Sequence, residues 1–131
     1  MQKLINHTST LEDNWVFLET VESSVPAGNV IVPGSHWLEN KEALASRQDI
    51  GIWLDSDAEP EAFIPEIANL PLIAIDFPAF ANGRGFSLAR LVKERSQFKG
   101  ELRAIGDVLL DQIYFMKRCG FDSFLLKDGL S

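Results

Sequence analysis

The chain has 131 residues, which suffices for one hydrophobic core, and 46% of them are hydrophobic, which excludes a disordered or fibrous protein. Apolar runs are only a few residues long, so no transmembrane helix is expected, and the net charge of −7 argues against binding to nucleic acid or to an anionic membrane surface. With one cysteine and no signal-peptide pattern, the sequence predicts a cytoplasmic protein without internal disulfides.

Strands and helices alternate along most of the sequence. In chain order we expect strand 14–19, strand 29–32, helix 36–47, strand 50–54, helix 61–68, strand 72–76, helix 86–98, strand 101–105, helix 108–119 and strand 123–126. Ser35 and Asp107 are expected as N-caps, and Gly120 as the residue that ends the last helix. A turn at residues 26–28 separates the first two strands.

This alternation predicts one α/β domain over residues 1–131. Strands that are continuous apolar runs joined by helices are typical of parallel sheets with both faces covered. We therefore expect a mostly parallel five-stranded sheet with helices on both faces, preceded by an N-terminal strand or hairpin. The alternative is an open, partial barrel-like arc, since five strands are too few to close an eight-stranded barrel.

Charge is distributed unevenly between the two parts of the chain. Residues 1–83 hold three basic and thirteen acidic side chains, whereas residues 84–131 hold nine basic and six acidic ones. Two interpretations of the basic residues remain open: a solvated helix flank, or a local site for an anion.

Candidate ligand-binding residues follow the strands, because ligands of parallel α/β sheets bind beyond the carboxyl ends of the strands. Asp76 ends a strand, Arg84 stands between two glycines, and Ser87 opens the next helix. Glycines allow close approach of a ligand, a helix N-terminus offers free N–H groups, and an arginine binds oxyanions through two donors. The alternative is an ordinary turn in which Arg84 pairs with Asp76 or Asp107.

Two further candidates belong to the next strand and the start of the next helix. Arg103 lies within a strand and needs a carboxylate partner if it is buried, for which Asp76 is the nearest candidate. Asp107 is an N-cap in the first place and a candidate ligand-binding residue in the second. Cys119 is expected to be a buried structural thiol, and the two histidines have no partner at metal-ligand spacing, so no metal site is expected.

Five segments in the second half of the chain have a recognisable pattern: Ile75–Pro78, Asn82–Leu91, Gly100–Leu109, Asp111–Gln112 and Lys117–Asp122. Through these segments the sequence resembles a small bacterial family of unknown function that is described as an oxidoreductase of sulfite reduction. Members of that family are usually encoded with assimilatory sulfite reductase and adenylyl-sulfate reductase. The resemblance implies a role in assimilatory sulfate reduction, at the sulfite step.

Three functions agree with these observations. The first is an accessory protein that binds a sulfur oxyanion, or that binds sulfite reductase or another sulfate-assimilation enzyme through its acidic N-terminal part. The second is a small oxidoreductase with a flavin or nicotinamide, against which Phe77, Phe80 and Phe86 would stack; the sequence itself identifies no cofactor. The third is a non-catalytic structural subunit. Three tryptophans leave room for an aromatic interface in a homo-oligomer.

Overall fold

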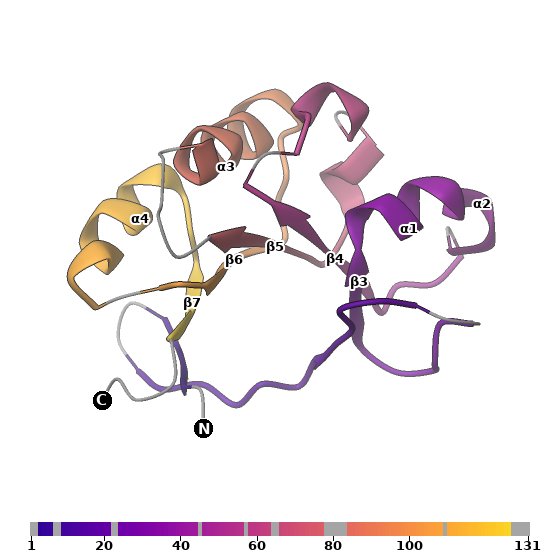
Figure 1. The fold of residues 1–131 in the computed structure, drawn as a ribbon, viewed down its shortest axis with the longest axis horizontal. Coiled ribbons are helices and arrows are strands. Elements are labelled where there is room, and N and C mark those ends of the chain that lie inside the picture. The colour runs from indigo at the N-terminus through magenta and orange to yellow at the C-terminus, as the bar shows by residue number, and fades with distance from the viewer. Residues whose placement is uncertain are drawn as a thin grey trace.

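The structure is a computed structural model that describes residues 3–6, 9–21, 24–44, 46–56, 58–63, 66–77, 84–108 and 110–126. Within these residues, seven strands form one sheet in the spatial order β1-β7-β6-β5-β4-β3-β2 (Figure 1). The strands are β1 (Lys3–Ile5), β2 (Val16–Phe17), β3 (Val30–Pro33), β4 (Ile50–Asp55), β5 (Leu72–Phe77), β6 (Glu101–Gly106) and β7 (Ser123–Leu126).

Helical segments connect successive strands from β3 onward. The α-helices are α1 (Gly34–Glu39), α2 (Lys41–Leu44), α3 (Arg84–Arg95) and α4 (Ile113–Cys119). Three shorter 3₁₀ turns are η1 (Pro60–Ala62), η2 (Glu66–Asn69) and η3 (Leu110–Gln112). None of the helices in the described part of the chain has the length and apolar character needed to cross a membrane.

Strands β2 to β7 lie side by side in chain order, and each neighbouring pair is parallel. Among the described strands, β1 alone is antiparallel, and it pairs with β7. Because the strand order never reverses, right-handed crossovers place every helix on the same side. The sheet accordingly curls into a half-barrel with the helices outside it (Figure 1). The α/β class is confirmed in the form of the open arc. The expectation of helices on both faces is wrong, since that arrangement requires a reversal of strand order.

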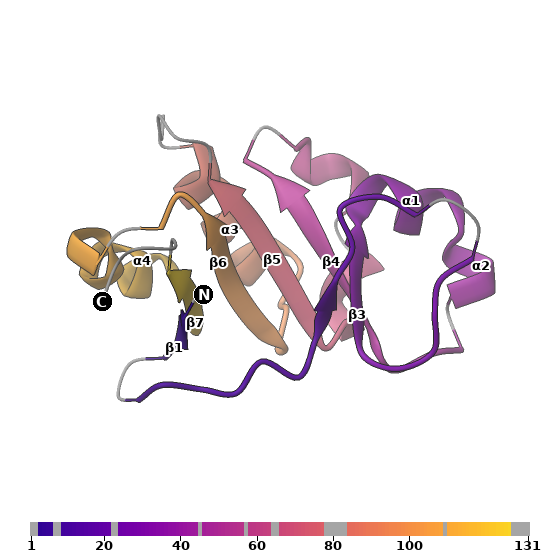
Figure 2. The ribbon, with the colours of Figure 1, turned by 60° about the horizontal axis from the view of Figure 1, so that its bottom comes forward.

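An extended segment takes the place of helices on the other side of the sheet. Residues 9–21, which we call the strap, run across this face from beside β1 to β2 at the opposite edge (Figure 2). The two sides of the sheet are hereafter the helix face and the strap face. The strap explains why residues 14–19 do not form a hairpin with β3: β2 lies within the strap and pairs in parallel with β3.

Most of the core lies on the helix face. Alternate residues of each strand point there, among them Ile52, Ile73 and Phe124, all with no exposed surface. A smaller apolar cluster on the strap face contains Leu72 and Ala74, with Trp15 and Trp53 packed against it. Burial of the larger cluster supplies the main favourable free energy of folding.

The predicted strands 50–54, 72–76, 101–105 and 123–126 agree with the observed ones to within one residue, and β5 and β6 pair in parallel. Helical boundaries differ more. The expected helix 36–47 begins earlier, at Gly34 after Pro33, and is interrupted at Asn40, so Ser35 is not its N-cap. Residues 61–68 contain parts of two 3₁₀ turns rather than an α-helix. Gly120 ends α4 in the left-handed conformation, as expected.

Candidate functional site

The strap and the sheet enclose a cavity of about 670 Å³ on the strap face, a volume in the range of small-ligand sites. We call it the strap cavity. Its lining residues are Leu4, Leu11, Asp13, Trp15, Phe17, Glu19, Trp53, Asp76, Ile105, Gly106 and Leu125. Trp53 and Phe17 form one wall, with ring centroids 5.6 Å apart. The cavity thus combines aromatic walls with carboxylates.

Two side chains of the sheet hold the strap over this cavity. The indole Nε1 of Trp53 donates a hydrogen bond of 2.9 Å to the carbonyl oxygen of Leu18. At the other end, Arg103 Nη1 lies 3.1 Å from Asp13 Oδ1. These two side-chain contacts add to the backbone pairing of the strap, which bonds to β1 through residues 10 and 11 and to β3 through β2.

Arg103 is the most buried charged residue of this region, with 3% of its surface exposed. Its Nη2 lies 2.9 Å from Glu101 Oε2, and its Nε is within 3.4 Å of Ser123 Oγ. The partner that we expected, Asp76, is not among its contacts. The reason is local: Glu101 stands two residues away on the same face of the same strand, and the strap brings Asp13 to the free side of the guanidinium.

Asp76 lies at the carboxyl end of β5, where it lines the strap cavity. Burial raises the pKa of Asp76, and the negative charges of Asp55 and Glu19 raise it further. A Cβ at Gly106, whose φ is +85°, would lie 2.3 Å from Asp76 Oδ1, so the glycine makes room for this carboxylate. Within the described part of the chain, neither Asp55 nor Glu19 has a cationic partner.

Of the other predicted site residues, Asp107 lies at the same end of the sheet as Asp76. Asp107 follows β6, and its N–H donates to the carbonyl oxygen of Phe77 over 2.9 Å, next to Asp76 in sequence. It does not cap a helix, because α4 begins only at Ile113. Ser87 lies exposed on α3. Residues 78–83, among them Phe80, and the side chain of Arg84 lie outside the described part of the chain, so the grouping of Arg84 with Asp76 stays a prediction.

Sequence reasoning missed the contribution of the strap. Trp15, Phe17 and Glu19 reach the cavity because a segment without helix or long strand crosses the sheet, which residue periodicity does not reveal. Two signals of it are present in the sequence: the strongly acidic N-terminal part and the tryptophans Trp15 and Trp53. Phe77 packs against Phe86 on the opposite face of the sheet, so these two rings support α3 rather than line the cavity.

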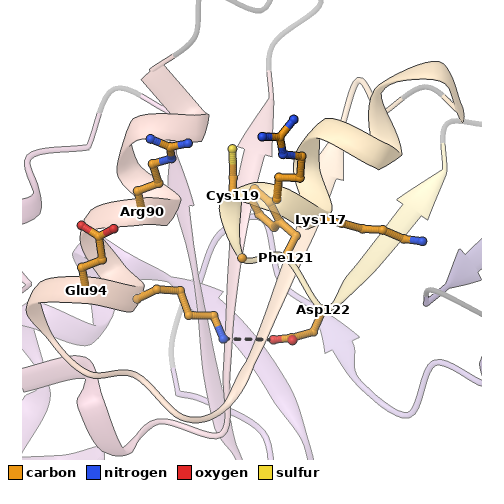
Figure 3. Close-up of a pocket in the computed structure, with 9 residues that line it drawn as sticks. Arg90, Glu94, Lys117, Cys119, Phe121 and Asp122 are labelled. Atoms are coloured by element: carbon orange, nitrogen blue, oxygen red, sulfur yellow. Dashed lines mark hydrogen bonds and ion pairs between the residues drawn. The ribbon is translucent and has the colours of Figure 1, made fainter.

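A second hollow lies on the helix face, between α3 and α4, and we call it the helix groove. Its lining residues are Arg90, Lys93, Glu94, Lys117, Arg118, Cys119, Gly120, Phe121 and Asp122. Figure 3 shows Arg90 of α3 and Cys119 of α4 pointing toward the same end of the groove, whereas Lys117 points away from α3. Four cationic and two anionic side chains give it a positive balance in an acidic protein.

Neither hollow has the ligands of a metal centre: among the described residues, no group of three or more His, Cys, Asp or Glu side chains is placed to hold a metal ion. The described structure is that of a half-barrel α/β protein with an acidic, aromatic cavity under a strap. A family model with the description "Bacterial protein of unknown function (DUF934)" matches residues 51–131, more than half of the chain. The chain belongs to this family.

This match confirms the resemblance at the level of a bacterial family of unknown function. The matched region begins in β4 and includes Asp76, Arg84, Ser87, Arg103 and Asp107, whereas the strap precedes it. No curated protein and no solved structure matches the chain.

Proposed function

We propose that this protein is an accessory protein of assimilatory sulfate reduction, which acts at the sulfite step by binding sulfite reductase or another enzyme of that pathway. The family resemblance supports the pathway, since members are usually encoded with assimilatory sulfite reductase. One structural observation supports the mode of action: the strap cavity carries carboxylates without cationic partners in the described part of the chain.

The chemistry of the cavity favours a basic side chain of the partner enzyme. Burial raises the pKa of Asp76, and the charges of Asp55 and Glu19 raise it further, which supports a negative potential at the cavity. Trp53 and Phe17 offer aromatic faces, which attract a lysine or arginine side chain through the ring quadrupole. Docking of a basic enzyme surface would neutralise the carboxylates and would accelerate association by electrostatic steering.

Calorimetric titration with purified sulfite reductase tests this docking. The double variant Glu19→Gln/Asp55→Asn should weaken binding about tenfold at low ionic strength, because two attractive charges are lost. Glu39→Gln/Glu42→Gln, which removes two exposed carboxylates on α1 and α2, is the matched control and should bind like the wild type. Equal weakening in both double variants would refute docking at the strap cavity.

The pathway is tested separately by growth of a deletion strain. Loss of the protein should impair growth on sulfate or sulfite as sole sulfur source and spare growth on sulfide or cysteine. Equal growth on every source, under conditions that require sulfite reductase, would remove the pathway from the proposal.

The proposal includes a small sulfur oxyanion near the start of α3, bound by Arg84 and Ser87 with Asp76, Arg103 and Asp107 around it. Since Arg103 is already bonded to Glu101 and Asp13, Arg84 is the arginine on which anion binding would depend. Arg84→Ala should weaken sulfite, sulfate or phosphate binding about ten- to a hundredfold in calorimetric titrations. Unchanged affinity in Arg84→Ala would show that this segment is only a turn.

A small oxidoreductase with a bound flavin or nicotinamide is the second candidate. The observation in its favour is the aromatic wall of the strap cavity, where Trp15 lies near the Phe17–Trp53 pair and a planar ring has surfaces on which to stack. A purified protein with flavin absorption bands, or saturable quenching of tryptophan fluorescence by added flavin or nicotinamide dinucleotide, would favour this candidate. A colourless protein without quenching would refute it.

A further inference from the structure

The helix groove differs from the strap cavity in charge and in the way its cations are placed. Lys93 Nζ lies 3.4 Å from Asp122 Oδ2, and the same oxygen accepts the N–H of Leu102 over 2.9 Å. Asp122 therefore has a structural role, because it accepts a backbone hydrogen bond from β6, and its charge is balanced by Lys93. The aliphatic stem of Lys93 packs against Gly120, where a Cβ would lie 2.9 Å from its Cγ.

Three cations are left over once this pair is set aside. Arg90, Lys117 and Arg118 have no hydrogen-bond or ion-pair partner in the described structure, and Glu94 is the single unpaired acid among the residues that line the groove. The helix groove therefore has an excess of positive charge, although the whole protein has a net charge of −7. A negatively charged occupant would gain from all three cations.

The placement of the cations indicates what kind of anion fits. A single small oxyanion needs donors that converge on one point, as in bidentate arginine sites. Here Arg90 reaches from α3 toward one end of the groove, whereas Lys117 points away from α3 (Figure 3). Cations spread along an open surface between two helices match carboxylates spread along a chain.

We propose that the helix groove binds an acidic segment of a second protein. This site lies on the opposite face of the sheet from the strap cavity, so the protein would have two docking surfaces of opposite charge. An accessory protein built in this way would bridge a basic partner and an acidic one. The groove proposal does not depend on the docking proposed for the strap cavity, because the two sites share no residue.

The test uses the full chain and a fluorescein-labelled octaglutamate peptide, with binding followed by fluorescence anisotropy at low ionic strength. Arg90→Glu/Arg118→Glu should weaken peptide binding about tenfold or more, because two attractions become repulsions. Lys99→Glu/Arg95→Glu is the matched control: it makes the same change in net charge at two exposed positions outside the groove. Thermal melts establish that each variant is folded.

A competition measurement separates a peptide site from a small-anion site. Unlabelled octaglutamate should displace the labelled peptide from the wild type at lower concentrations than inorganic phosphate or pyrophosphate does. Equal loss of peptide affinity in the groove variant and the control would overturn the proposal. So would displacement of the labelled peptide by inorganic phosphate or pyrophosphate at lower concentrations than by unlabelled octaglutamate, since this would indicate a small-anion site.

Discussion

The two faces of the sheet are made by the same strands and have opposite character. On β4, Ile50, Ile52 and Leu54 point to the helix face and are almost fully buried. Trp53 and Asp55 alternate with them and point to the strap face, where one is half-buried and the other exposed. One strand thus contributes to the main core and to a candidate binding site through its period of two.

In β5 and β6 the same alternation places core residues on the helix face and candidate binding residues on the strap face. Ile73, Ile75 and Leu102 belong to the core under the helices, whereas Asp76 and Arg103 face the strap. A face covered by helices must be apolar, because helices bury it against a continuous hydrophobic stripe. A face covered by one extended segment leaves space beside the strap, and polar groups there can be satisfied by the strap or by a ligand.

The largest expected effect tests the helix face. Phe124→Ala should destabilise the protein by about 3–5 kcal/mol, because it opens a cavity among fully buried side chains. The neighbouring Leu125→Ala, on the strap face and partly exposed, should cost only about 1–2 kcal/mol. Urea denaturation of both variants measures the difference. Equal losses would contradict the assignment of the main core to the helix face.

The next effect tests the attachment of the strap. Arg103→Ala leaves the carboxylates of Glu101 and Asp13 without their guanidinium, and we expect a loss of about 1–3 kcal/mol, since both carboxylates are about one-third exposed. Faster hydrogen exchange should be confined to the strap and β6. Arg103→Lys, which keeps the charge but loses the planar fork, should recover part of the loss. Uniformly faster exchange would indicate a general loss of stability instead.

The elements that the sequence predicted well are those in which local pattern and tertiary role coincide. Strand β5 is a continuous apolar run ended by Asp76, and it is a central strand in the structure. Gly120 after an amphipathic run predicted the end of α4, because few other residues adopt its positive φ. Parallel pairing of β5 with β6 followed from the helical stretch between them.

The face on which the helices lie could not be predicted from local pattern. That face depends on whether the strand order reverses, which is decided by contacts between residues far apart in the chain. The site suffers from the same limit: Asp13 and Arg103 are 90 residues apart in sequence, and nothing in the sequence around Asp13 marks it as the partner of a buried arginine. The place of Asp76 near the end of β5 could be predicted, because the carboxyl ends of parallel strands can be located from the strands alone.

A smaller effect concerns the second attachment point of the strap. Trp53→Phe keeps an aromatic ring in the cavity wall but removes the hydrogen bond to Leu18, and we expect a loss of about 1 kcal/mol. Limited proteolysis within residues 9–21 should become faster. Trp15→Phe is the control, since in the described structure the Trp15 indole donates no hydrogen bond. Equal susceptibility of both variants would show that the Trp53 hydrogen bond does not hold the strap.

The smallest effect comes from Asp76 and depends on pH. Because burial and the charges of Asp55 and Glu19 raise its pKa, the folded protein binds this proton more tightly than the unfolded chain does. Stability should therefore fall as pH rises from the ordinary Asp pKa through the raised pKa of Asp76, and should not change further from this cause above it. Asp76→Asn removes this dependence, so melting temperatures between pH 3.5 and 7 should show the variant gaining on the wild type as pH rises. If the difference in melting temperature between Asp76→Asn and the wild type were constant with pH, the strap cavity would not perturb the pKa of Asp76. The negative potential that we assign to the strap face would then have no support from titration.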